Sequence, residues 1–173
     1  WNMPLIEPFE TRELQKIEYF VIVIDTSMSC KAGLVQKFLE ETYGILSQSE
    51  TFGRRFRVHI LQCDERVQSD VVIESAEQLQ EYMREFQVQG LGGTDFRPAF
   101  EYVNGLLAKK TFHKLRGLIY FTDGYGTFPV KTPQYDTAFV FFREDYLDVD
   151  VPPWAMKLIL DERDIGETVD IVR

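Results

Sequence analysis

One stretch constrains the fold of this chain more than any other. An unbroken apolar run over residues 20–24 ends in Asp25, and Ser27 and Ser29 follow at every second position. A run without polar alternation predicts a strand that is covered on both faces, as in a parallel sheet. Asp25, Ser27 and Ser29 would then lie in the loop at the carboxyl end of the strand, where open α/β sheets bind ligands. The remaining chain is interpreted as a scaffold that brings more oxygen ligands to this loop.

Length and charge limit the possible functions. The 173 residues suit one domain, and 28 acidic against 19 basic side chains give a formal charge of −9. This balance argues against a nucleic-acid partner, which clustered Lys and Arg would bind, and fits a cation or a basic protein surface. Two cysteines, Cys30 and Cys63, have neither zinc spacing nor a disulfide pattern, so we expect a reducing compartment, the cytoplasm. No apolar run approaches the roughly 20 residues of a membrane helix.

The pattern of strands and helices predicts the fold class. Residues 1–14 are interpreted as a lead-in segment and residues 15–173 as the domain, excised from a longer protein because the chain lacks an initiator Met. Helices are predicted over about 31–47, after a capping box at Ser75, and near Pro98. Strands are predicted over 17–25, 56–63, 67–74, 117–122, 138–142 and 156–160. This order predicts a three-layer, doubly wound α/β fold whose mostly parallel sheet has one antiparallel edge strand, 67–74.

Two further polar loops follow predicted strands or precede a helix: Gly92-Gly-Thr94-Asp95 and Thr122-Asp123-Gly124. With the first loop they supply carboxylates and hydroxyls, which are the oxygen ligands that Mg²⁺ and Mn²⁺ prefer. Few carboxylates beside neutral hydroxyls would leave the ion able to accept a carboxylate from outside. Without a metal, Asp25 and Asp123 would repel each other and one would tend to bind a proton, so metal affinity should fall at acid pH.

These residues together resemble the metal-ion-dependent adhesion site of von Willebrand factor A (VWA) domains. That family has Asp-x-Ser-x-Ser after its first strand, then Thr in a Gly-Gly-Thr loop, then Asp in a Thr-Asp-Gly turn. The resemblance covers about residues 17–160. It implies that Ser27, Ser29 and Thr94 contact the ion directly or nearly so, and that Asp25 and Asp123 hold it directly or through water.

The chain is most similar to bacterial VWA-like domains at the carboxyl end of putative metallopeptidase proteins, whose companions include MoxR-type ATPases. The resemblance implies a protein-interaction module that binds Mg²⁺ or Mn²⁺ and an acidic residue of a partner. The chain contains no His-Glu-x-x-His motif, so the resemblance implies no peptidase activity for it. We therefore do not expect the domain to be an enzyme. Asp64 lies in a turn that resembles the family's turn after its second strand. We expect Asp64, Asp95, Gly93 and Gly124 behind the ligands or at the rim.

Several alternatives remain open from the sequence alone. Asp25, Ser27 and Ser29 could merely cap the following helix, and Asp95 could cap the next one. A hydrolase could use Asp25 and Asp123 as a carboxylate pair, but a second Asp-Thr/Ser-Gly triplet is absent. An aspartyl-phosphate enzyme would carry Asp where Ser27 stands. The metal site could also be unused in a structural scaffold. His59 is predicted to be solvated, since it alternates with apolar residues.

Overall fold

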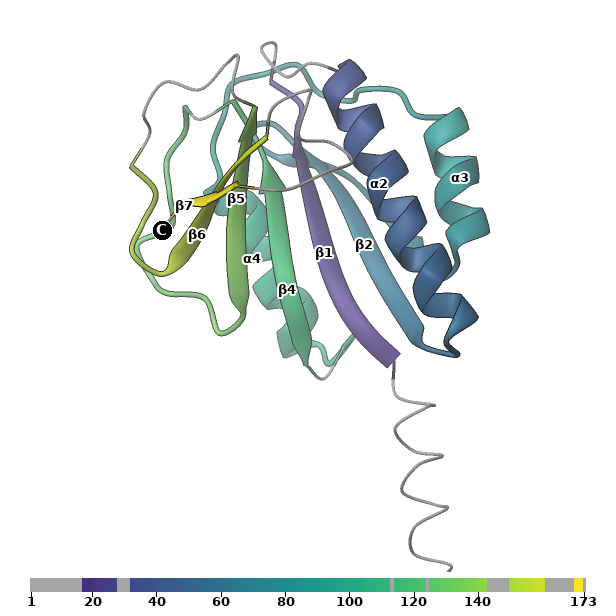
Figure 1. Ribbon diagram of the computed structural model, residues 1–173. Helices are drawn as coiled ribbons and strands as arrows, with labels where there is room; N and C mark the ends of the chain where they lie inside the picture. Colours follow the sequence, from purple (N-terminus) through teal and green to yellow (C-terminus); the bar gives the residue numbers. More distant parts are fainter. Residues whose placement is uncertain are drawn as a thin grey trace, which may run out of the picture.

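The computed structural model describes residues 17–27, 32–112, 114–123, 125–142, 150–160 and 170–172. These residues form one sheet of seven strands in the order β3-β2-β1-β4-β5-β6-β7, with three helices packed on it (Figure 1). The strands are β1 (Ile17–Asp25), β2 (Arg55–Cys63), β3 (Val67–Ile73), β4 (Leu115–Phe121), β5 (Asp136–Phe142), β6 (Ala155–Leu160) and β7 (Asp170–Val172). The helices are α2 (Ala32–Thr51), α3 (Ala76–Arg84) and α4 (Arg97–Ala108).

Strand β1 lies at the point where the direction of winding changes. It pairs in parallel with β2 on one side and with β4 on the other. The chain therefore moves outward to β2 and β3, then returns across β1 to start β4. In an open α/β sheet this switch point, at the carboxyl ends of the strands, is where ligands bind. Asp25 is the last residue of β1 and lies at that edge.

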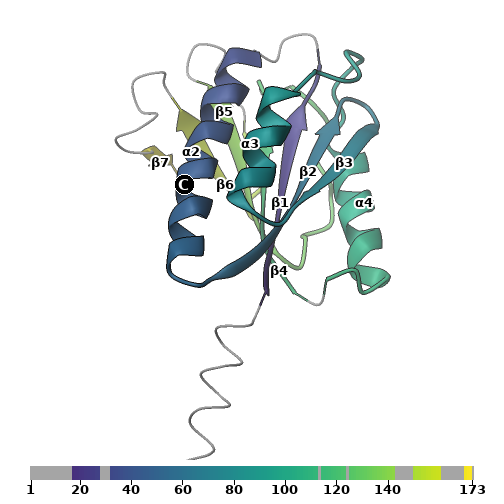
Figure 2. The same cartoon turned by 90° about the vertical axis from the view of Figure 1, so that its right-hand side faces the viewer.

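Helices cover both faces of the sheet, which confirms the predicted three-layer α/β fold. Helices α2 and α3 lie on one face and α4 lies on the other (Figures 1 and 2). Two clusters of buried side chains lie between the sheet and its helices. One contains Val35, Leu39 and Leu79, and the other contains Phe100 and Val103. Because β1 contributes alternate residues to both clusters, its run from Val21 to Ile24 is buried without interruption.

The two edges of the sheet differ from one another. Strand β3 pairs antiparallel with β2 and forms the predicted edge. At the other edge the three-residue β7 pairs antiparallel with β6, and this strand was not predicted. The predicted start of α3 at Ser75 is confirmed: the Gln78 backbone N–H donates to Ser75 Oγ (3.1 Å), while Gln78 Oε1 accepts from the N–H of Glu74 (2.7 Å), one residue before the cap.

The connection from β4 to β5 contains no helix over residues 125–135. Phe128 takes part in covering the sheet there. Its ring packs 4.8 Å from that of Phe96 and 5.0 Å from that of Phe139, measured between centroids. In the absence of a helix here, the aromatic side chain of Phe128 helps to cover the buried rings of Phe96 and Phe139.

The prediction that His59 is solvated was wrong. His59 is 3% exposed, because β2 is an interior strand that is covered on both faces. Its Nδ1 lies 2.9 Å from Asp70 Oδ1 of β3, and the Tyr102 hydroxyl of α4 donates to Asp70 Oδ2 (2.6 Å). The ring of His59 also packs edge-on at 5.6 Å from Phe112. His59 therefore faces the side of the sheet that α4 covers, and not the solvent.

The Asp70 cluster should make stability depend on pH. Burial raises the pKa of Asp70, but hydrogen bonds from His59 and Tyr102 and the charge of His59 outweigh it and lower the pKa. A lowered pKa in the folded state adds stability above the ordinary pKa of Asp, and this is lost as pH falls through the folded value. We expect Asp70→Asn to cost about 1–3 kcal/mol at neutral pH and progressively less as pH falls below the ordinary pKa of Asp. Urea unfolding over this pH range measures the change, and a cost that does not depend on pH would contradict this account.

Candidate functional site

Asp25 is the buried centre of the candidate site. It is fully buried at the end of β1, where Oδ1 accepts a hydrogen bond from the Ser27 backbone N–H (2.9 Å). Its Oδ2 accepts a hydrogen bond from the hydroxyl of Thr122 (2.6 Å), the residue that follows β4. The two central strands are therefore joined through this carboxylate at the switch point. The role of Thr122 was not predicted, although its position directly before Asp123 was the available signal.

Asp123 brings a second carboxylate to the same place. Burial raises the pKa of Asp25, hydrogen bonds from Thr122 and Ser27 oppose this, and the negative charge of Asp123 raises it further. The charge of Asp123 is thus felt at Asp25, as predicted for two aspartates at neighbouring strand ends. Ser27 is 5% exposed, whereas Asp123 is partly exposed to solvent.

The glycine-rich loop before α4 is fastened to the end of β2. Gln62 Nε2 donates to the Gln87 carbonyl (3.1 Å), and Gln62 Oε1 accepts from the Gln89 N–H (2.8 Å). The Leu91 N–H donates to the carbonyl of Thr26 (3.1 Å), which ties the loop to the one that holds Asp25 and Ser27. The loop is therefore held against β2 and, at Leu91, against the loop of Asp25.

Asp64 holds the centre of this loop. Oδ2 accepts from the Gly92 N–H (3.0 Å), and Oδ1 accepts from the Arg66 N–H and from Gln68 Nε2 (2.9 Å each). Burial raises the pKa of Asp64, but these hydrogen bonds outweigh it and lower the pKa overall. A Cβ at Gly90, where φ is +114°, would lie 2.7 Å from Asp64 Oδ2, so only glycine fits. Asp64 therefore fastens the loop to the turn after β2.

We expect Asp64→Asn to loosen this loop. Either orientation of the amide turns its NH₂ group toward an N–H donor, of Gly92 or of Arg66. The cost should be about 1–3 kcal/mol, because a buried donor loses its acceptor. Urea unfolding and hydrogen exchange of the Gly92 amide measure the effect. The exposed neighbour Glu65 provides the control, since Glu65→Gln should change stability by less than about 0.5 kcal/mol. Equal effects of the two substitutions would contradict a loop-fastening role.

Thr94, near the end of the glycine-rich loop, lies against the loop that follows Asp123. A Cβ at Gly126 would lie 2.9 Å from Thr94 Cγ2 and 2.8 Å from the ring of Phe96, so the two loops are in close contact. Asp95 accepts hydrogen bonds from the Arg97 N–H (3.0 Å) and from its guanidinium group (2.8 and 3.0 Å). Asp95 therefore supports the first turn of α4 from the position before the N-cap residue Phe96, which itself makes no side-chain cap hydrogen bond.

The structure brings four of the five predicted ligands to one edge of the sheet: Asp25, Ser27, Thr94 and Asp123. Ser29, the fifth, and Gly124 lie outside the described residues, and Gly93 is exposed in the loop beside Thr94. The oxygen atoms of these side chains fit Mg²⁺ or Mn²⁺. Over the described ranges, no group of three or more His, Cys, Asp or Glu residues could hold a metal ion. The candidate set therefore depends on the hydroxyls as well as on the two carboxylates.

The hydroxyl of Thr26 is an unexpected feature of this edge. Thr26 is fully buried, and its Oγ1 has no hydrogen-bond partner among the described residues. A Cβ at Gly90 would lie 2.9 Å from this oxygen, so the glycine backbone covers it. The sequence identified Thr26 only as the residue between two proposed ligands, and nothing in the structure explains its unpaired hydroxyl.

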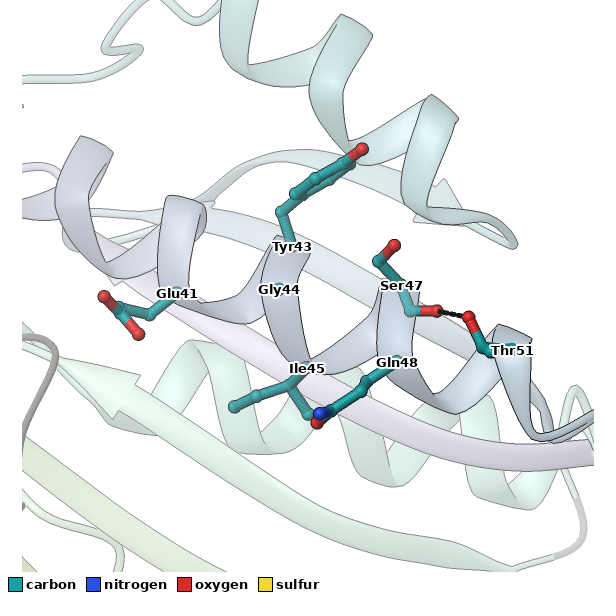
Figure 3. Close-up of a pocket in the computed structure, with 7 residues that line it drawn as sticks. All are labelled: Glu41, Tyr43, Gly44, Ile45, Ser47, Gln48 and Thr51. Carbon is teal, nitrogen blue, oxygen red and sulfur yellow. Dashed lines mark hydrogen bonds between the residues drawn. The ribbon is translucent and has the colours of Figure 1, made fainter.

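A pocket elsewhere on the molecule does not coincide with this site. It lies along the second half of α2, whereas the site lies where β1 ends (Figures 1 and 3). Helix α2 alone lines it, with one carboxylate, Glu41. The pocket therefore offers no convergent polar groups from different elements. None of the helices in the described part of the chain is long and apolar enough to cross a membrane.

Comparisons with solved structures agree with this fold. The chain resembles VWA2, an ArnB paralog from Sulfolobus acidocaldarius, with 17% identity and a TM-score of 0.51 over 75% of this chain and 36% of that one. It resembles the SpRpn10 VWA domain with 10% identity and a TM-score of 0.51 over 84% and 89% of the two chains. Proximal thread matrix protein 1 of the mussel byssus gives 10% identity and a TM-score of 0.54 over 90% and 44%. At these identities the likeness shows the fold.

The family comparison is more specific. Comparison with curated proteins gave no match. This chain spans only 36% of VWA2 and 44% of proximal thread matrix protein 1. The family described as "VWA-like domain (DUF2201)" matches residues 20–161, from the first strand of the sheet to the residue after β6. The chain therefore belongs to this VWA-like domain family.

Proposed function

We propose that this domain binds Mg²⁺ or Mn²⁺ at the carboxyl edge of its sheet and uses the ion to bind an acidic residue of a partner protein. Domains of the VWA type are typically protein-interaction modules. The observation that carries the proposal is the buried carboxylate of Asp25 at the switch point, which is hydrogen-bonded to Ser27 and feels the charge of Asp123.

The donor set suits this role chemically. Asp25, Ser27, Thr94 and Asp123 would hold the ion, together with Ser29. A bound cation would balance the negative charges of Asp25 and Asp123. Two carboxylates and neutral hydroxyls leave a divalent ion able to accept a further carboxylate from outside. The cation thus supplies the positive charge that a partner's Asp or Glu would recognise.

The proposal assigns no catalytic residue to the domain. In a catalytic carboxylate pair the two groups share a proton. In the proposed site a cation, and not a shared proton, balances the charges of Asp25 and Asp123. Hydrolysis of a peptide or phosphoester by the wild type, lost in Asp25→Asn, would instead support a hydrolase.

The proposal also concerns the biological setting. We propose a cytoplasmic domain that recruits or regulates a separate protein, such as a MoxR-type ATPase or an attached metallopeptidase-like domain. The free thiol of Cys63 agrees with a reducing compartment, and its burial raises its pKa to about 11. Binding of such a partner should be lost on adding a chelator and restored by excess Mg²⁺.

Thermal unfolding tests the cation claim. A ligand that binds only the native state at about 100 times its Kd stabilises by about 2.7 kcal/mol. For a domain of this size we expect Mg²⁺ or Mn²⁺ to raise Tm by about 5 to 10 °C. The increase should disappear with EDTA and should shrink at acid pH, where protons compete for the carboxylates. A Tm that neither cation changes at millimolar concentration would refute the proposal.

A further inference from the structure

Two large apolar side chains are exposed on the loops that carry the candidate metal site. Leu91 is 55% exposed, and its backbone N–H is bonded to the carbonyl of Thr26, the residue between Asp25 and Ser27. Tyr125 is 59% exposed and lies two residues after Asp123. Its neighbour Gly126 contacts the loop of Thr94. An exposed apolar residue and an exposed aromatic residue thus lie on two of the loops that carry proposed ligands.

The backbone of Leu91 makes its exposure more unusual. Its φ is +73°, in the left-handed region that glycine adopts freely and β-carbon-bearing residues adopt at a cost. Gly90, Gly92 and Gly93 surround it, so glycine is the ordinary residue of this loop. The leucine side chain is largely solvent-exposed, so burial in the core does not account for it. Strain that the core does not require is typical of binding loops.

The negative charge of Glu65, beside the loop of Leu91, indicates a third contact with a partner. A Cβ at Gly93 would lie 3.5 Å from Glu65 Oε2, and one at Gly92 would lie 3.6 Å from Glu65 Oε1, so this exposed carboxylate lies against the loop of Leu91. With a cation bound, the edge would present a positive centre, apolar flanks and a negative charge at one side. A complementary partner would present the opposite charges in the same order.

We infer that the rim formed by Leu91, Tyr125 and Glu65 selects the partner, a protein segment in which an Asp or Glu is neighboured by an apolar side chain and by a Lys or Arg. This inference rests on the proposed function, since the carboxylate binds through the cation. The apolar contacts supply affinity that a single carboxylate cannot, because aromatic and aliphatic anchors dominate most interfaces. Glu65 supplies charge complementarity, which mainly governs specificity and the rate of association.

A displayed library of short random peptides tests the inference on the whole domain in the presence of Mg²⁺ or Mn²⁺. We expect selected sequences to contain Asp or Glu beside Leu, Ile, Phe or Tyr, with Lys or Arg close by. Leu91→Asn and Tyr125→Ser should each weaken the selected peptides by about tenfold or more. Both variants should keep the cation-induced rise in Tm, since neither residue is a proposed ligand. Leu91→Asn should not lower Tm in the absence of peptide, because Asn tolerates positive φ.

A matched control is Phe52→Ser, which removes an aromatic ring that is 73% exposed just beyond the end of α2, away from the site. It should leave peptide binding unchanged. Selected peptides with a carboxylate but no apolar enrichment, or no selection at all although the cation binds, would overturn the rim inference alone. A domain that neither cation stabilises would instead refute the proposed function. Equal loss of peptide binding in Phe52→Ser and Tyr125→Ser would also overturn the inference.

Discussion

Replacing Asp25 with asparagine should abolish cation binding without unfolding the domain. The amide keeps the size of the carboxylate and can still form hydrogen bonds with Ser27 and Thr122, but it loses the negative charge. The affinity for Mg²⁺ or Mn²⁺ should fall at least about 100-fold, since losing even an outer partner of a metal ligand costs about 10–100-fold. Calorimetric titration of both proteins measures the change.

The same substitution should leave the metal-free protein equally stable or more stable at neutral pH. Burial, and secondarily the charge of Asp123, raises the pKa of Asp25 above its ordinary value. A raised pKa in the folded state means that stability falls as pH rises from the ordinary value through the folded value. Removing the charge removes this penalty. A metal-binding residue thus shows opposite effects on stability and on affinity, whereas a residue that only caps a helix would show a loss of stability alone.

The control for Asp25→Asn is Asp136→Asn, at the exposed start of β5. The parallel strand β5 begins at the sheet edge opposite to the one where β1 ends. This substitution changes the net charge by the same amount and should leave cation affinity unchanged within about twofold, because exposed charges at this distance are largely screened. If both substitutions weakened binding equally, the effect would be one of overall charge and Asp25 would not be a ligand.

Replacing Phe96 with alanine should have the largest effect on folding. Phe96 is fully buried, and its ring centroid lies 5.0 Å from that of Tyr120 and 4.8 Å from that of Phe128. Its backbone N–H also donates to the carbonyl of Thr127 (3.2 Å). Truncating such a ring leaves a cavity and should cost about 3–5 kcal/mol. Urea unfolding measures the loss.

The loss should extend to the candidate site, because Phe96 lies two residues after Thr94 and its ring contacts Gly126. Phe96→Ala should therefore weaken cation binding even under conditions where the protein stays folded. Phe52→Ala removes the same number of atoms from an exposed position and should cost less than about 0.5 kcal/mol. A comparable cost for both substitutions would contradict the packing that is described for Phe96.

The fold was largely predictable because the strongest patterns in the chain are local. An uninterrupted apolar run specifies a strand with two covered faces, and Ser75 with Gln78 specifies a helix start. Placing Asp25 and Asp123 together needed only the rule that neighbouring parallel strands end at one edge. Strand β7 was missed because its three residues are too few for a detectable pattern.

The fastening of the site was not predictable, because it depends on contacts between residues far apart in sequence. Gln62 holds backbone groups 25 and 27 positions away, and Asp64 holds one 28 positions away. No spacing rule identifies such partners. His59 was misjudged for a related reason: alternation indicates which side of a strand a residue occupies, but not whether a helix such as α4 covers that side.

The most direct test of the central claim is to locate the ion. Crystals grown with Mn²⁺ and measured for anomalous scattering should show one strong peak at the carboxyl end of β1. We expect that peak in contact with the hydroxyls of Ser27 and Thr94, with Asp25 and Asp123 bound directly or through water, and absent in Asp25→Asn. A peak elsewhere on the molecule, or a peak that persists in Asp25→Asn, would contradict the account.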